Sequence, residues 1–113
     1  MMQAAVADDV FLALSSSVRR KILEQLTIGP ATVSDLAAPF DMKLPSFVQH
    51  LSVLENSHLV TSKKQGRVRT YELSPEPLQL AENWLAERRQ SWVERFDRFD
   101  DYLNQLKEKE AKS

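Results

Sequence analysis

The feature that most constrains this chain is its last third, which contains no glycine or proline after Pro77. The segment opens with Ser74-Pro75-Glu76-Pro77, a typical helix start, because it combines a capping hydroxyl, prolines in the first turn and an acid at the positive end of the helix dipole. The sequence therefore predicts a helix over residues 75 to about 107, followed by a solvated, fraying tail over 108–113. At about 1.5 Å per residue this helix spans roughly 48 Å, which exceeds the diameter of a domain of this size.

Apolar side chains recur along this predicted helix at spacings of seven, seven, four, three, four and three residues, close to the repeat of helices that pack along their length. They are Leu78, Leu85, Trp92, Phe96, Phe99, Leu103 and Leu106. One small domain cannot cover such a stripe, so a second copy of the chain is expected to cover it. The residues expected in this homodimer interface are Leu85, Trp92, Phe96, Phe99 and Leu103. Alternatively, Trp84, Trp92, Phe96 and Phe99 line a pocket for an unknown small-molecule effector between the subunits.

The composition is that of a single globular domain over residues 1–113, with 42% apolar and 27% charged residues. No stretch approaches the roughly 18 apolar residues of a membrane helix, and the N-terminus lacks the pattern of a signal peptide. The chain is therefore expected in the cytoplasm, with no membrane partner. The absence of cysteine excludes disulfides and thiolate metal sites.

Nothing in the sequence indicates an enzyme. There is no glycine-rich phosphate loop, the serines at 15–17 have no glycine elbow, and the paired carboxylates Asp100 and Asp101 fall on a solvated helix face. The two histidines, His50 and His58, have no metal-ligand spacing, and His58 is expected to be a solvated loop residue. We therefore expect no catalytic residue, no cofactor and no metal.

The N-terminal part of the chain is predicted to be a succession of short helices. Helical spacing of apolar residues predicts helices over 6–14 and 17–26, with one of the intervening serines as a cap for the second. Gly29-Pro30 ends this unit. Arg19, Arg20 and Lys21 lie at the start of the second helix. Arg20 either touches a phosphate or pairs with Asp8, Asp9 or Glu24.

Two further helices follow at a short distance from each other. Thr32 is expected to cap a short helix over 33–40, with Asp35 in its first turn. After a short turn over 41–44, Pro45 suits the first position of a helix running to about Asn56. This arrangement predicts a helix-turn-helix. Three apolar side chains of the second helix are expected to face inward: Phe47, Leu51 and Leu54.

The spacing of the apolar residues changes after residue 58, where two extended segments, 59–65 and 67–73, flank a turn at Gln65-Gly66. Glycine supplies the positive φ that a tight hairpin turn requires. From Lys43 to Leu73 there are five basic and two acidic residues, whereas the segment after Leu73 has seven basic and nine acidic ones. This compact basic region favours a nucleic-acid partner despite the net charge of −1. The predicted fold is mainly α with a β-hairpin wing.

A helix-turn-helix followed by a basic hairpin is the winged helix-turn-helix arrangement, in which a helix enters the major groove and hairpin cations neutralise phosphates. In these segments the chain resembles the ArsR/SmtB family of bacterial repressors. The resemblance covers about residues 6–73, and the long terminal helix matches the family's dimerisation element more loosely. It is carried by residues 14–23 (LSSSVRRKIL), 33–37 (VSDLA), Leu44-Pro45, 50–54 (HLSVL), Leu59-Val60, Gly66-Arg67 and 71–73 (YEL).

The resemblance implies a homodimeric repressor of transcription that binds a pseudo-palindromic site in double-stranded DNA. Residues 45–56 would form the recognition helix, 59–73 the wing and 75–107 the dimerisation helix. The DNA-binding residues expected on this basis are Lys43, Ser46, Phe47, Gln49, His50 and Ser52 in the helix-turn-helix and Lys63, Lys64, Arg67 and Arg69 in the wing.

The chain departs from the family at two places. Members commonly carry a serine and then a basic residue immediately before the histidine, where this chain has Val48 and Gln49. Val48 either meets a thymine methyl group or is buried, and Gln49 can read an adenine edge. The ligands of the family's metal sites are also missing, because residues 34–38 contain no cysteine and the terminal helix contains no histidine.

Other interpretations of the same residues remain open. His50 is either close to DNA or purely structural, and the wing cations either contact phosphates or form an ordinary solvated hairpin. A rival function is that of a protein-interaction module, which the near-neutral charge and the acidic terminal helix favour. Salt dependence distinguishes the two, because binding through several phosphates weakens steeply with added salt.

Overall fold

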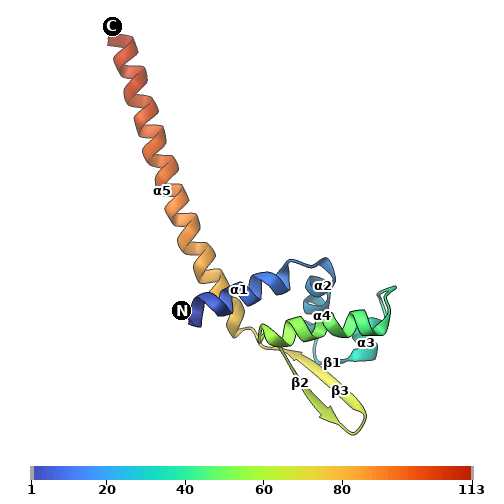
Figure 1. Cartoon of the computed structure of the whole chain (residues 1–113). Coiled ribbons are helices and arrows are strands. Elements are labelled where there is room, and N and C mark those ends of the chain that lie inside the picture. The colour runs from blue at the N-terminus through green and yellow to red at the C-terminus, as the bar shows by residue number, and fades with distance from the viewer. Residues whose placement is uncertain (1, 113) are drawn as a thin grey trace. The chain divides into compact units, whose positions relative to one another are not determined.

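The computed structural model describes residues 2–112 and the side chains of residues 7–111. It confirms a mainly helical fold with a hairpin wing and a long C-terminal helix (Figure 1). The chain divides into two compact units, one ending at Ala81 and the other beginning at Glu82. The elements in chain order are α1 (Met2–Leu14), α2 (Ser17–Leu26), β1 (Ala31–Thr32), α3 (Val33–Ala37), α4 (Leu44–Asn56), β2 (Val60–Gln65), β3 (Val68–Leu73) and α5 (Glu76–Lys112).

Local capping chemistry determines where α2 and α3 begin. The Ser16 hydroxyl oxygen accepts a hydrogen bond from the Arg19 N–H at 3.4 Å, and the Thr32 hydroxyl oxygen accepts one from the Asp35 N–H at 3.2 Å. The prediction for α2 is confirmed at both ends. The α3 helix is shorter than the predicted 33–40, because Pro39 lacks the N–H that would continue the helical hydrogen bonds.

The first helix begins earlier than predicted, at Met2 rather than at residue 6. The side chain of Val6, which the sequence placed on its apolar face, lies outside those that the structure describes. Val10 and Ala13 of α1 are fully buried.

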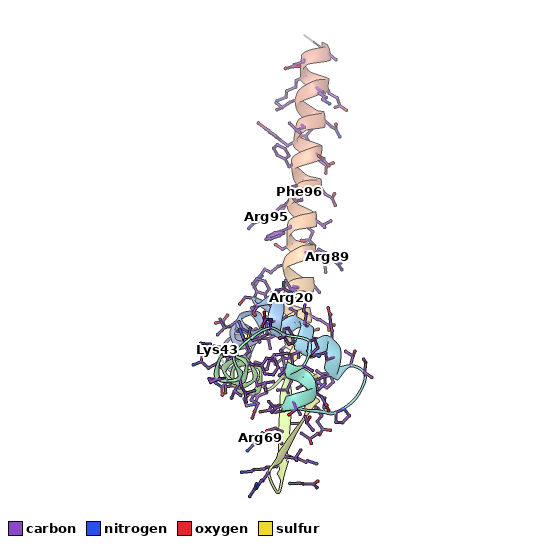
Figure 2. All side chains as sticks on the ribbon, turned by 90° about the vertical axis from the view of Figure 1, so that its right-hand side faces the viewer. Arg20, Lys43, Arg69, Arg89, Arg95 and Phe96 are labelled. Carbon is purple, nitrogen blue, oxygen red and sulfur yellow. The ribbon has the colours of Figure 1, made fainter. Side chains whose placement is uncertain are left out.

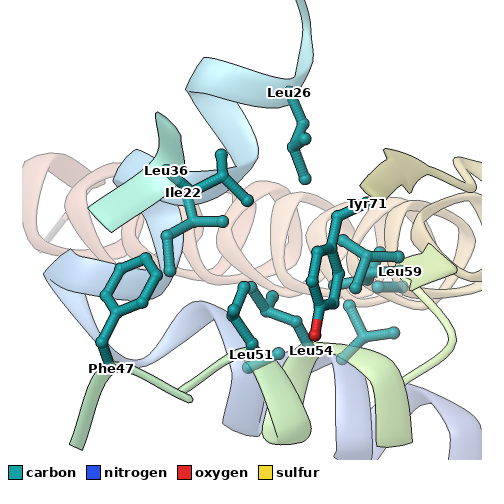
Figure 3. Packing of buried hydrophobic residues seen from close by; sticks show 12 residues of the cluster. Ile22, Leu26, Leu36, Phe47, Leu51, Leu54, Leu59 and Tyr71 are labelled. Carbon is teal, nitrogen blue, oxygen red and sulfur yellow. The ribbon is translucent and has the colours of Figure 1, made fainter. Parts of the chain in front are cut away.

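The core of the first unit takes apolar side chains from every helix and from both strands of the hairpin (Figure 3). Phe47 is the largest of the fully buried side chains, and its ring centroid lies 5.5 Å from that of Phe40. Burying one such side chain stabilises a fold by roughly 1.5–3 kcal/mol. The other buried hydrophobic residues of this cluster are Val10, Ala13, Ile22, Leu26, Leu36, Leu51, Leu54, Leu59, Val60, Tyr71 and Ala81.

The sheet has three antiparallel strands in the order β1-β3-β2. In the hairpin Gln65 pairs with Val68, so the connection is the two-residue loop Gly66-Arg67 and not the predicted Gln65-Gly66. Gly66 has φ +61°, as predicted, whereas Arg67 does not have a positive φ, a combination typical of a type II′ turn. The sequence did not predict β1, in which Ala31 pairs with Tyr71 and Thr32 with Thr70.

The α5 helix has 37 residues and reaches Lys112, so its predicted end at about residue 107 is too early. The predicted exposure of the tail is confirmed for residues 108–111, and residue 113 lies outside the described residues. Its length is roughly 55 Å at about 1.5 Å per residue. Among the described side chains from Glu82 onward, all are exposed except the half-buried Ser91. Within the described part of the chain, no helix combines the length and the apolar character that crossing a membrane requires.

Candidate nucleic-acid interface

The α4 helix has one face in the core and one in solvent. Phe47, Leu51 and Leu54 are at most 1% exposed and hold the helix against the rest of the first unit. Phe47 is therefore unable to contact DNA, and its place in the predicted DNA-binding set is wrong, whereas its predicted inward orientation is confirmed. The exposed side chains of the predicted set on this helix are Ser46, Gln49 and Ser52.

The start of α4 adds a positive charge to this exposed face. Lys43 is the N-cap residue, with extended backbone and no side-chain cap hydrogen bond, and Pro45 lies in the first turn. Lys43 is exposed, so its ammonium group is available to an anion at the positive end of the helix. Figure 2 views α4 from this end, with Lys43 beside the helix and Arg69 on the wing. Val48, 40% exposed, adds an apolar surface next to Gln49.

The four wing cations do not share one face. Side chains alternate along a strand, and directly paired residues lie on the same face. Lys64 pairs with Arg69, and Ser62 pairs with the buried Tyr71, so Lys64 and Arg69 lie on the face that continues from the core. Lys63 lies on the opposite face.

The Arg67 cation lies in the turn itself, at the tip of the wing. The wing is therefore a ribbon with two cations on its core-side face, one on the other face and one at its tip. All four side chains are exposed.

A hydrogen-bonded chain joins the wing to the end of α4. Arg69 Nη1 donates to the Ser62 hydroxyl oxygen at 2.8 Å, and the Ser62 hydroxyl donates to Glu55 Oε2 at 3.3 Å. Tyr71 also hydrogen-bonds to the Glu55 carboxylate; burial, and then that carboxylate, raise the pKa of the tyrosine. Glu55 thus acts as a shared acceptor that connects the helix to both strands of the wing.

His50 is half-buried, and its Nδ1 lies 2.9 Å from Nη1 of Arg19 on α2. Burial, and then the positive charge of Arg19, lower the pKa of His50 below its ordinary value of 6.5. His58, as expected, is exposed in the turn before β2, with φ +62°.

Sequence reasoning missed the roles of Arg19 and Glu55. Arg19 is 31 positions from His50 along the chain, and no local pattern connects them. Glu55 was counted only as a negative charge in a basic region. Arg20, for which pairing with an acid or a phosphate was weighed, donates from Nη1 to the Leu14 carbonyl oxygen at 2.7 Å.

Within the described residues, no group of three or more His, Cys, Asp or Glu side chains could hold a metal ion. The first unit has an apolar cavity of about 200 Å³ lined mainly by Leu14, Leu23, Leu59, Leu73 and Leu78. Its volume is below the roughly 300–1,000 Å³ of a typical ligand site.

Comparison with known proteins places this geometry in a family. Residues 14–63 match the model of a helix-turn-helix domain. The chain is 35% identical over 78 residues to the transcriptional repressor SdpR of Bacillus subtilis (strain 168), a match that covers 69% of this chain and 87% of SdpR.

Solved structures agree with the sequence comparison. The crystal structure of an ArsR family transcriptional regulator superposes with a TM-score of 0.76 at 47% identity, covering 80% of this chain and 93% of that one. An ArsR-like transcriptional regulator from Rhodococcus sp. RHA1 gives a TM-score of 0.71 at 28% identity, covering 85% of this chain and 91% of that one. The chain therefore belongs to the ArsR family of helix-turn-helix transcriptional regulators.

Proposed function

We propose that the chain represses transcription as a homodimer that binds a pseudo-palindromic operator in double-stranded DNA. The observation that carries this proposal is the exposed polar face of α4, with Lys43 at its start and the wing cation Arg69 linked to its end through Ser62 and Glu55. Similarity to proteins named as repressors supports the direction of regulation. This function requires no catalytic step, and it would be carried out in the cytoplasm.

In this proposal α4 reads bases in the major groove. Gln49 is exposed and can bond both the N6 and N7 positions of an adenine, and Val48 can contact a thymine methyl group. Ser46 and Ser52 lie on the same exposed surface. The Ser52 hydroxyl donates to the Val48 carbonyl oxygen at 3.1 Å, and its oxygen remains able to accept another hydrogen bond.

The wing supplies affinity that does not depend on sequence. Lys64 and Arg69 lie directly opposite each other in the hairpin, an arrangement in which like charges repel and destabilise the pair. A DNA phosphate placed against Lys64 and Arg69 would relieve this repulsion, and its neutralisation would release counterions from the DNA. Arg67 at the tip would reach a second phosphate, whereas Lys63 faces the other way.

We further propose that α5 dimerises through its apolar stripe. The side chains of Trp92, Phe96 and Phe99 are 60%, 67% and 57% exposed, and Leu85 and Leu103 are 52% and 38% exposed. Large apolar side chains gathered on an exposed surface mark an interaction site. The near-heptad spacing favours another long helix as the partner, and a second copy of this chain supplies one.

The experiment that tests the proposal measures fluorescence anisotropy on the chain's own upstream promoter fragment, across salt concentrations and against competitor DNA. We expect tight, competitor-resistant binding, with the logarithm of the affinity falling linearly with the logarithm of the salt concentration. Weak binding that does not distinguish the fragment from competitor, and that is indifferent to salt, would contradict operator recognition and favour a protein-docking role.

A further inference from the structure

The side chain of Arg19 makes hydrogen bonds in two directions at once. Its Nε donates to the Ala13 carbonyl oxygen at 2.8 Å, and Nη2 donates to the Leu12 carbonyl oxygen at 2.8 Å. Both carbonyls belong to the last turn of α1, where helical partners are missing. The remaining nitrogen, Nη1, lies 2.9 Å from Nδ1 of His50 on α4. The guanidinium group is therefore held on one side by α1 and faces the imidazole on the other.

The chemistry of the two groups determines the state of the imidazole. A guanidinium group carries only donors and stays protonated in proteins, so His50 Nδ1 must accept through its lone pair. The single proton of the neutral ring is then on Nε2. Protonation of Nδ1 would bring two N–H groups against each other at 2.9 Å, so this contact excludes the imidazolium form. Burial and the Arg19 charge lower the pKa of the ring, in agreement with a neutral form.

The other side of the ring points to a ligand outside the chain. His50 follows the exposed Gln49 on α4, and its ring is only half-buried. Among the described residues, the hydrogen bond of His50 is the one to Arg19 through Nδ1. The Nε2–H donor is therefore left to a partner, and DNA offers suitable acceptors in its phosphate oxygens and in the base edges of the major groove.

We propose that Arg19 is a positioning residue for DNA recognition, which fixes His50 as the Nε2–H tautomer so that α4 presents one neutral N–H donor to an acceptor on DNA. This inference rests on the proposed function, since it assigns a role within the same surface. The Arg19–His50 contact itself does not depend on DNA and can be tested in the free protein.

The first experiment examines that pair alone. Long-range proton–nitrogen NMR spectra of the free protein report which imidazole nitrogen carries the proton, with the exposed His58 as the internal comparison. We expect His50 to show the Nε2–H form, and Arg19→Lys to shift it toward a mixture of the two tautomers, because a lysine cannot reproduce the planar fork. Arg20→Lys is the matched control and should leave the His50 signals unchanged. An Nδ1–H signal for His50 in the unmodified protein would overturn the proposal.

The second experiment separates the two nitrogens of His50. The amide oxygen of His50→Asn can replace Nδ1 as the acceptor for Arg19, but this side chain has no donor at the Nε2 position. His50→Gln places its amide N–H near the Nε2 position and loses the acceptor near Arg19. If the outward donor matters, the asparagine variant should bind the operator fragment roughly ten-fold more weakly, and the glutamine variant should keep most of the affinity. Equal losses in the two variants, or no loss in the asparagine variant, would overturn the proposal.

Operator variants identify the acceptor on DNA. A phosphate acceptor predicts that His50→Asn weakens all operator variants by the same factor, whereas a base acceptor predicts a change in their ranking. In either case Arg19→Lys should cost less affinity in the His50→Gln background than in the unmodified protein, because the donor there no longer depends on Arg19. Equal costs in both backgrounds would show a merely structural arginine. If the unmodified protein fails to bind DNA, the proposed function fails, and the NMR result still decides the tautomer.

Discussion

Lys64 and Arg69 face each other across the hairpin, on the same face as the buried Tyr71. Two cations held in direct opposition form a charged site that a single anion can bridge. Arg69 is in addition tied to Ser62, so its guanidinium position is fixed by the fold. We infer that this face of the wing, rather than the opposite face with Lys63, provides the main phosphate contact.

The first prediction concerns Lys64 and Lys63, which lie on opposite faces of the wing. Lys64→Ala should weaken binding to all DNA sequences and lower the slope of log affinity against log salt by about 1. Lys63→Ala removes the same charge from the neighbouring position on the other face and should change the slope much less. Anisotropy titrations at several salt concentrations check both variants. An equal change in the slope for the two lysines would refute the assignment of faces.

The second prediction concerns base reading by α4. Gln49→Ala should change the ranking of operator variants, because it removes the side chain that can bond an adenine edge. One such contact discriminates against the wrong base by about 1–3 kcal/mol. Competition binding with single-position operator variants measures this ranking. Lys64→Ala is the contrasting control, since it should weaken every variant equally. An unchanged ranking for the Gln49 variant would show that another side chain reads the bases.

The third prediction concerns the core position of Phe47. Phe47→Ala should lower the free energy of unfolding by about 3–5 kcal/mol, because it leaves a cavity beneath α4. Val48→Ala, at the neighbouring 40% exposed position, should cost much less. Urea denaturation at one fixed protein concentration is the measurement, since dimerisation would couple stability to concentration. Similar losses for the two variants would contradict the assignment of faces on α4.

The fourth prediction concerns the apolar stripe on α5. Phe96 is labelled on α5 in Figure 2. Phe96→Lys should shift the protein from dimer to monomer in sedimentation experiments, because it puts a charge among the exposed apolar side chains of the stripe. Glu94→Lys gives the matched control, since two residues along a helix place it on roughly the opposite side. Circular dichroism should show helix retained in both variants. A Phe96 variant that sediments like the unmodified protein would refute this interface.

The fifth prediction concerns pH. The folded state lowers the pKa of His50 below 6.5 through burial and the charge of Arg19, the charged group that acts on this ring. As the pH falls, His50 therefore binds a proton at a higher pH in the unfolded chain than in the folded one. The free energy of unfolding should decrease as the pH drops through about 6.5. His50→Gln removes this titration, so the unmodified protein should lose more stability than the variant between about pH 7 and pH 5. Parallel stability curves for the two proteins would count against the Arg19–His50 contact.

Helix positions and the wing could be predicted because their signals are local. Thr32 and Gly66 act within a few residues of themselves, through a cap and a turn, and the structure places both as expected. Of the three serines at 15–17, one of which was expected to cap the second helix, the structure identifies Ser16 as the cap. The end of α3 was predicted too late, although the missing N–H of Pro39 was visible in the sequence. The end of α5 was predicted too early, since nothing after Pro77 requires the helix to stop.

Contacts between distant segments could not be predicted in the same way. The two residues of β1 are too few to show alternation, and their pairing with Thr70 and Tyr71 depends on the assembled core. The Arg19–His50 contact likewise depends on how α1, α2 and α4 pack. The division of the wing cations between faces was not predicted, because the sequence placed the turn at Gln65-Gly66, one residue before the loop Gly66-Arg67 that sets the register.

The short strand β1 also sets the mechanical behaviour of the wing. Thr32 both ends β1 and caps α3, while β1 itself holds β3 only at Thr70 and Tyr71. The root of the hairpin, at Thr70 and Tyr71, is thus connected to α3 through β1, whereas the part of the hairpin from Arg69 to its tip is not paired with a third strand. We infer that the part of the wing beyond Arg69 bends more readily than its root, because only the root is paired with a third strand.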